Sequence, residues 1–122
     1  MGGGEVKKPY KIIRTTIGEY LMSKEPYSGI GVYIFACYPS LECLYIGKSK
    51  YVYDRIRYHF KDPDEPLSMF IKSIMEDSIR FRLDILVPDS QNDLEWIDKA
   101  EKALIFHFQP QFNTRGIITV SF

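Results

Sequence analysis

The chain is short of the features that mark several classes of protein. Two cysteines and two histidines in 122 residues form no disulfide framework, and the cysteines lie too far from either histidine for a zinc site. No apolar run approaches the roughly 20 residues that span a bilayer, and no apolar block follows the N-terminal lysines to make a signal peptide. We therefore expect a cytoplasmic protein that is not bound to a membrane. Cys37 and Cys43, which flank an expected turn and could face each other, are expected to be reduced thiols.

The length and composition fit one folded domain. Apolar residues make up 45% of the chain and aromatic residues 15%, which suits a globular core. We expect a flexible leader over residues 1–9, an N-terminal helix or extension over 10–28, the main domain over 29–116, and a tail or extra strand over 117–122.

The net charge of zero argues weakly against a nucleic-acid partner, but the charges are unevenly placed. Residues 48–61 hold five basic residues and one acidic residue, whereas residues 84–101 hold six acidic residues and one lysine. Such a basic stripe suits a protein that meets an anion on one side, although solvated helix faces would look the same. The candidate nucleic-acid-binding residues of this stripe are Lys48, Lys50, Arg55, Arg57 and Lys61.

Hydrophobic periodicity and turn residues predict alternating short elements. The predicted helices cover residues 10–24, with Thr15 or Thr16 as the N-cap, and 50–61, 67–77 and 92–108. The predicted strands cover 31–37 and 42–47, which form an antiparallel hairpin, together with 80–87 and 117–122. This order indicates a small α+β domain around a mostly antiparallel sheet.

Glu101 is the most unusual residue of the predicted long helix. Leu94, Ile97, Leu104 and Phe108 form an apolar stripe, and Glu101 occupies the position of that stripe between Ile97 and Leu104. A carboxylate there costs free energy unless a positive group meets it. Two interpretations remain open, a half-buried glutamate paired with an arginine and a metal ligand.

Arg55 and His59 are four residues apart, so they lie one above the other on the predicted helix over 50–61. The buried stripe of that helix ends at Phe60 or at His59. A guanidinium offers a planar fork for a phosphate. Lys48 follows Gly47 at a strand-to-helix turn, where free backbone N–H groups also favour an anion.

Two tyrosines and two glycines stand out in the predicted hairpin. Alternation places Tyr33 and Tyr45 on one face, opposite aliphatic residues, so both phenols project from the same side if the aliphatic side is the core. Packing is the commoner role of tyrosines in strands. Gly31 and Gly47 indicate bulges or a close approach of the backbone.

Together these residues resemble the GIY-YIG nucleases, a group that includes the nuclease domain of UvrC-type repair proteins, some homing endonucleases and some restriction enzymes. Gly31-Val32-Tyr33 is similar to the first signature, and Tyr45-Ile46-Gly47 is the second letter for letter. The resemblance covers residues 29–116, and the ordered series is more specific than either tripeptide. It continues through Lys48, Arg55, His59, Glu101 and Asn113.

The resemblance implies a small central three-stranded antiparallel sheet flanked by helices. It also implies an endonuclease that hydrolyses DNA with one Mg²⁺ or Mn²⁺ ion held by Glu101. Tyr33 would take the proton of the attacking water, and Tyr45 would orient that water or share the role. Arg55 would neutralise charge on the phosphate in the transition state.

Further roles follow from the same resemblance. His59 would orient the water or the phenol, and Asn113 would support the site. A phenol with a reference pKa near 10 needs neighbours that favour its anion, and the expected ones are the metal ion and two side-chain cations, Arg55 and Lys48. DNA is the expected partner, double-stranded or branched, with a homo-oligomer or a targeting partner as further expectations. Repair, restriction and mobile-element roles all fit, and a non-catalytic binding module on the same fold is the alternative.

Overall fold

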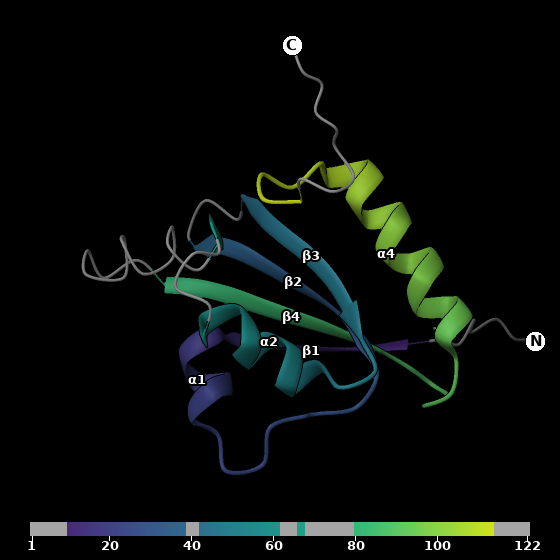
Figure 1. Ribbon diagram of the computed structural model, residues 1–122, viewed down its shortest axis with the longest axis horizontal. Coiled ribbons are helices and arrows are strands. Elements are labelled where there is room, and N and C mark those ends of the chain that lie inside the picture. The colour runs from purple at the N-terminus through teal and green to yellow at the C-terminus, as the bar shows by residue number, and fades with distance from the viewer. Residues whose placement is uncertain (1–9, 39–41, 62–65, 68–79, 114–122) are drawn as a thin grey trace, which may run out of the picture.

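The predicted hairpin is present in the structure, a computed structural model that describes residues 10–38, 42–61, 66–67 and 80–113 (Figure 1). Strands β2 (Gly31–Tyr38) and β3 (Cys43–Ser49) run antiparallel, with Tyr33 directly opposite Gly47. The register shifts between Phe35 and Ala36, so the irregularity lies away from both signature glycines.

Strand β4 (Arg80–Pro88) confirms the strand predicted over 80–87, and it pairs antiparallel with β2. Every second residue of β4 is buried, beginning at Phe81 and ending at Val87. The residues between them face the other side, where Asp84 accepts hydrogen bonds from Arg14 and Arg82 at 3.3 and 3.1 Å. β4 is therefore a central strand with one apolar and one largely polar face.

The prediction of a helix over residues 10–24 is wrong in its first half. Residues Tyr10–Thr16 form strand β1, which pairs antiparallel with β4, and only Ile17–Met22 form helix α1. The run from Ile12 to Thr16 is rich in β-branched residues, which favour a strand when a partner strand is present. Among the described residues the sheet consequently has four strands rather than three, in the order β1-β4-β2-β3.

The predicted N-cap of the first helix and the predicted starts of the helices over 50–61 and 92–108 are close to the observed ones. Thr16 is the N-cap of α1, and its hydroxyl accepts a hydrogen bond from the N–H of Glu19 at 3.1 Å. Helix α2 (Val52–Lys61) follows a turn in which the Ser49 hydroxyl accepts from the N–H of Tyr51 at 2.9 Å. Helix α4 (Leu94–Phe108) begins two residues later than predicted, and Asp93 is its N-cap.

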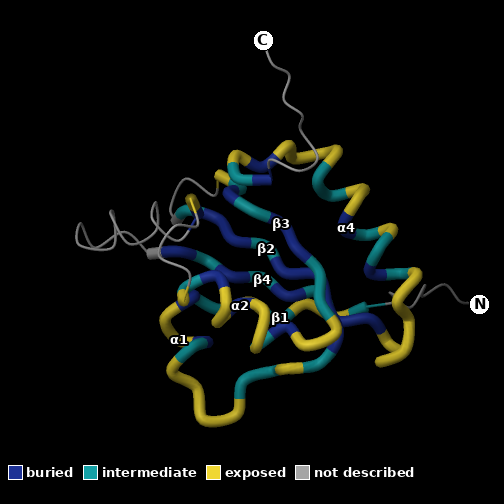
Figure 2. Tube along the Cα trace, viewed as in Figure 1, coloured by how far each residue is buried: buried dark blue, intermediate teal, exposed yellow. Residues whose placement is uncertain are grey.

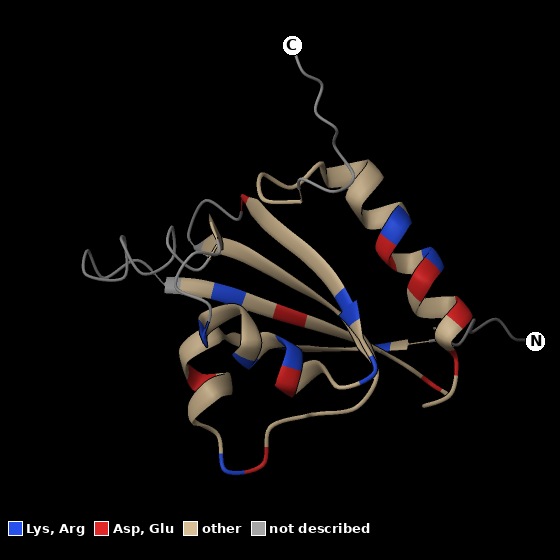
Figure 3. Ribbon diagram, in the orientation of Figure 1, with Lys and Arg blue, Asp and Glu red and all other residues tan. Residues whose placement is uncertain are grey.

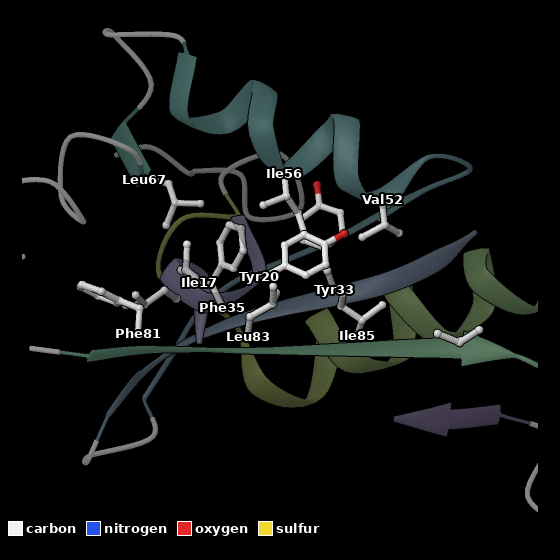
Figure 4. Close-up of a cluster of buried hydrophobic side chains, with 12 residues drawn as sticks. Ile17, Tyr20, Tyr33, Phe35, Val52, Ile56, Leu67, Phe81, Leu83 and Ile85 are labelled. Atoms are coloured by element: carbon white, nitrogen blue, oxygen red, sulfur yellow. The ribbon is translucent and has the colours of Figure 1, made fainter. Parts of the chain in front are cut away.

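Helices pack against both faces of the sheet. α1 and α2 lie on one face and α4 packs along β3 and β2 (Figure 1). The larger core forms beneath α1 and α2, where Val52 and Ile56 of α2 meet Tyr33 and Phe35 of β2 (Figure 4). A smaller cluster beneath α4 contains Ile30, Val32, Ile46 and Ile97.

Burial follows this layered arrangement. Buried positions concentrate on β2, β3 and β4, whereas the outer turns of the helices are exposed (Figure 2). Both faces of β2 are therefore buried. The face with the aromatic side chains Tyr33 and Phe35 packs against the larger cluster, and the face with Val32 and Ile34 packs in the smaller one. The condition drawn from the sequence, that the aliphatic side is the core, is met only in part, because the face that carries the two phenols is also a core.

The two cysteines are free thiols that belong to different clusters, so they do not face each other as the sequence allowed. Burial raises the pKa of both thiols, that of Cys43 to about 11, which keeps them protonated at neutral pH. The predicted leader (1–9), the predicted strand over 117–122 and most of the predicted helix over 67–77 lie outside the described residues. No helix in the described part of the chain is long and apolar enough to cross a membrane.

Replacing Phe35 with Ala should lower the free energy of unfolding by about 3–5 kcal/mol, because the side chain is fully buried between β4 and α2 and leaves a cavity. Urea denaturation followed by circular dichroism measures this change. Ile12→Ala on β1 is the control, since Ile12 is 42% exposed and should cost far less. Equal losses in the two variants would contradict the layered core.

Candidate active site

Tyr33 and Tyr45 share one face of the hairpin, as alternation predicts, and their ring centroids are 6.1 Å apart. That face is covered by α2, so Tyr33 is fully buried and Tyr45 is half-buried. The Tyr33 ring also packs against Phe35 at a centroid distance of 5.6 Å. The two phenols therefore lie inside the molecule, at the boundary between β3 and α2.

Gly47 leaves room for the Tyr33 phenol. A Cβ atom on Gly47 would lie 2.4 Å from Tyr33 Oη and 2.5 Å from its Cζ, well inside van der Waals contact. Gly31 is also closely packed, since its Cβ would lie 3.0 Å from the Leu86 carbonyl oxygen and 3.3 Å from Val52 Cγ2. Of the two explanations that the sequence offered for these glycines, close approach is the one that applies.

His59 contacts the buried phenol directly. Its Nε2 atom lies 2.8 Å from Tyr33 Oη, and its ring meets the Tyr45 ring edge-on at a centroid distance of 4.9 Å. His59 is only 3% exposed, so it completes the buried stripe of α2, whereas Phe60 is only partly buried. The imidazole can exchange a proton with the phenol across this hydrogen bond.

Arg55 lies one turn before His59 and extends from the exposed side of α2 to the same phenol. Burial raises the pKa of Tyr33 above its ordinary value of 10, and the Tyr45 phenol raises it further. The hydrogen bond and the positive charge of Arg55 lower the pKa of Tyr33, but burial dominates. Tyr33 is thus a neutral phenol at pH 7 in the protein alone.

Lys48 and Glu101 lie on the opposite side of β3 from the phenols. Successive strand residues point to opposite faces, so Gly47 faces α2 and Lys48 faces α4. The Lys48 ammonium lies 3.9 Å from Glu101 Oε1 and also contacts Asp98 one turn earlier on α4. Of the two cations expected to favour the Tyr33 phenolate, Arg55 lies beside it, whereas Lys48 lies against these carboxylates.

Glu101 is 8% exposed and faces the sheet, as its place on the stripe predicts, while Leu94 and Phe108 at the stripe's ends are exposed. One of the two interpretations required an arginine partner; within the described residues, Glu101 forms an ion pair with Lys48. Asp98 was not singled out from the sequence, although its position three residues before Glu101 places both carboxylates on one helix face.

The carboxylates of α4 fit one divalent cation only in part. Within the described residues, no group of three or more His, Cys, Asp or Glu side chains is placed to hold a metal ion. Glu101 and Asp98 already share the Lys48 ammonium, so their oxygens are arranged around one positive charge. Mg²⁺ is commonly bound by one or two carboxylates with water and substrate phosphates as further ligands, which this pair can supply.

Asn113 binds the backbone of the second signature tripeptide. Its Oδ1 atom accepts a hydrogen bond from the Ile46 N–H at 2.8 Å, and its Nδ2 donates to the Ile46 carbonyl at 2.7 Å. The neighbouring Phe112 N–H donates to the Leu44 carbonyl at 2.8 Å. Asn113 therefore pairs with the outer edge of β3 much as another strand would.

The predicted basic stripe does not form one surface. Arg57 stacks over the Tyr53 ring at 5.5 Å and, with Lys61, borders a groove next to α1. Arg55 instead points to Tyr33 and stacks over Tyr58. Basic positions appear at the end of β3 and along α2, while acidic and basic positions alternate along α4 (Figure 3).

Most acidic residues of α4 are paired with its own lysines. Glu95 accepts from Lys99 at 2.9 Å, and Asp98 accepts from Lys102 at 3.0 Å. Hydrogen bonds from Lys48 and Lys102 hold the pKa of Asp98 below its usual range. The α4 surface is therefore less acidic in effect than its sequence suggests.

Comparisons with protein-family models, with curated proteins and with solved structures found no match for this chain.

Gly47→Ala should destabilise the fold by about 1–3 kcal/mol, because the new Cβ must displace a fully buried Tyr33 ring. Gly18→Ala is a matched control, since nothing lies within 4 Å of its added Cβ. Alanine is favoured over glycine in a helix, so that control should be neutral or stabilised by up to about 1 kcal/mol. Thermal and urea unfolding measure both changes, and an unchanged stability of Gly47→Ala would mean that the phenol does not lie over Gly47.

Proposed function

We propose that the protein is a metal-dependent endonuclease that hydrolyses DNA phosphodiester bonds. The observation that carries this proposal is the convergence on one buried phenol of an imidazole, a second phenol and an arginine, beside a strand whose other face meets a buried carboxylate. The residues that meet here are the ones whose spacing resembles the GIY-YIG series. Packing alone would not require this set of groups.

Tyr33 and His59 would act together on the attacking water once substrate binding uncovers the Tyr33 phenol, which is fully buried in the protein alone. As the water oxygen bonds to phosphorus, its proton passes to Tyr33 Oη, and the phenolic proton of Tyr33 passes to His59 Nε2 across the 2.8 Å hydrogen bond. The bond between phosphorus and the leaving oxygen then breaks. Such a relay avoids a free phenolate, which the burial of Tyr33 disfavours.

The remaining residues would bind and position the substrate. Arg55 would donate to the phosphate oxygens and stabilise the charge that develops on them. Tyr45 would orient the water beside His59, and Asn113 would fix the backbone that carries Tyr45. Glu101, with Asp98 beside it, would hold one Mg²⁺ or Mn²⁺ ion, which when bound would polarise the phosphate and stabilise the leaving oxygen.

A second function rests on the Lys48–Glu101 pair. A buried carboxylate that meets an ammonium is also what a purely structural ion pair needs. The protein would then be a module that binds nucleic acid or another partner without cleaving it. The two functions differ in whether Glu101 is needed for cleavage or only for stability.

Supercoiled plasmid should be nicked or cut with Mg²⁺ or Mn²⁺ and remain intact with EDTA. Glu101→Gln and Tyr33→Phe should each lower the cleavage rate by at least about 100-fold, since each removes a group that acts on the reacting atoms. Gel analysis of the products over time measures these rates. DNA binding in EDTA should be retained in both variants.

Matched variants separate chemistry from packing. Glu95→Gln changes an exposed glutamate of the same helix, and Tyr20→Phe removes another buried tyrosine hydroxyl, one that binds the Tyr27 carbonyl. Both should cleave at the wild-type rate. If wild-type protein binds DNA but never cleaves it, the binding module is the better account.

The pH dependence of cleavage should distinguish a relay from direct ionisation of Tyr33. With His59 present, the imidazole takes the phenolic proton, so the rate should not depend on a free Tyr33 phenolate in the alkaline range. In His59→Gln the phenol must lose its proton unaided. Because the pKa of Tyr33 is raised, that variant should be slower and its rate should keep rising into the alkaline range. Parallel pH–rate profiles for the two proteins would contradict the relay.

A further inference from the structure

Two exposed tyrosines lie on either side of Arg55. Tyr51, at the start of α2, is 64% exposed, and Tyr58 is 56% exposed. The Tyr51 carbonyl accepts the first helical hydrogen bond, from the Arg55 N–H at 3.0 Å, so Tyr51 lies one turn before Arg55. The Arg55 guanidinium lies 5.6 Å from the centre of the Tyr58 ring. Aromatic rings and a cation therefore alternate along one helix at the surface.

A groove of about 510 Å³ opens beside Tyr51, between the starts of α2 and α4. Its walls are about equally polar and apolar, with Ile30 and Leu94 on the apolar side and Lys50, Gln91 and Asn92 on the polar side. Its volume is sufficient for a nucleobase with part of its sugar, and amide side chains are common partners of base edges. The groove thus extends the aromatic and basic surface of α2 away from Tyr33.

One wall of this groove is fixed by specific contacts. Gln91 Oε1 accepts hydrogen bonds from the Ile30 N–H at 3.3 Å and from the Tyr27 hydroxyl at 3.2 Å. The absence of a side chain at Gly29 makes this possible, because a Cβ there would lie 2.4 Å from Gln91 Oε1. The Gln91 amide is therefore held in place at the groove wall.

We propose that Tyr51, Tyr58 and this groove bind unpaired nucleotides next to the cleaved bond, so that the substrate is DNA with a single-stranded segment. The inference rests on the proposed function, in which Arg55 binds the reacting phosphate. Exposed aromatic rings bind nucleic acid by stacking on base faces, which are free in a single strand and occupied in a duplex. Since the net charge is zero, attraction to phosphates alone gives little affinity for DNA. Stacking of bases on the tyrosine rings would supply the remaining affinity.

The test is binding without cleavage. Fluorescence anisotropy in EDTA and low salt measures the affinity for a short labelled single strand and for the duplex of the same sequence. The wild-type protein should bind the single strand more tightly. Tyr51→Ala and Tyr58→Ala should each weaken single-strand binding by roughly tenfold or more, and duplex binding much less. Tyr51→Phe, which keeps the ring, should bind as wild type.

Phe106→Ala is the matched control, because Phe106 is an 81% exposed aromatic residue on α4. It should leave both affinities unchanged, and thermal unfolding should show that all variants are folded. Tighter duplex binding, or no loss in the tyrosine variants, would overturn the inference. Because the assay contains no metal, such a result leaves plasmid cleavage by the wild-type protein, and hence the proposed function, to be judged separately.

Discussion

The close approach of the Tyr33 ring to Gly47 is the contact on which the candidate site depends. The ring occupies the space where any other residue at position 47 would place its Cβ. This position brings the phenolic oxygen to His59 and Arg55 of α2 and brings the ring beside Tyr45. A single missing side chain in the edge strand thus allows four functional groups to meet.

The candidate site has two halves, the phenols with α2 and the carboxylates of α4, and they lie on opposite faces of strand β3. β3 connects them because it contributes residues to both. Tyr45 and Gly47 face α2, whereas Ile46 and Lys48 face α4. Asn113 holds the outer edge of β3 by two hydrogen bonds to Ile46, the residue between those on the α2 side. A shift of β3 by one residue would exchange the two faces, so this pairing at its edge fixes the register of the whole site.

Sequence periodicity was sufficient for elements whose residues alternate strictly, and insufficient where tertiary partners decide. Strand β4 and the inward position of Glu101 follow from local patterns alone and are confirmed. The sequence prediction for residues 10–16 was a helix, and it is wrong because strand β1 forms by pairing with β4. That pairing joins residues about 70 positions apart, such as Ile13 and Ile85. The burial of Tyr33 was also missed, because no local pattern indicates that helices cover both faces of the sheet.

The resting state of the site bears on how such a protein would become active. In the protein alone Tyr33 is a neutral phenol, and the Lys48 ammonium lies against Glu101 and Asp98 on the α4 side of β3. A bound phosphate would attract both Lys48 and Arg55 by its negative charge. If the Lys48 ammonium moved to the phosphate, Glu101 and Asp98 would no longer contact it and could bind a divalent cation. A site with so few carboxylates would therefore bind its metal well only together with DNA. Under the proposed function, cleavage would be confined to the complex in which substrate and cation complete each other's coordination.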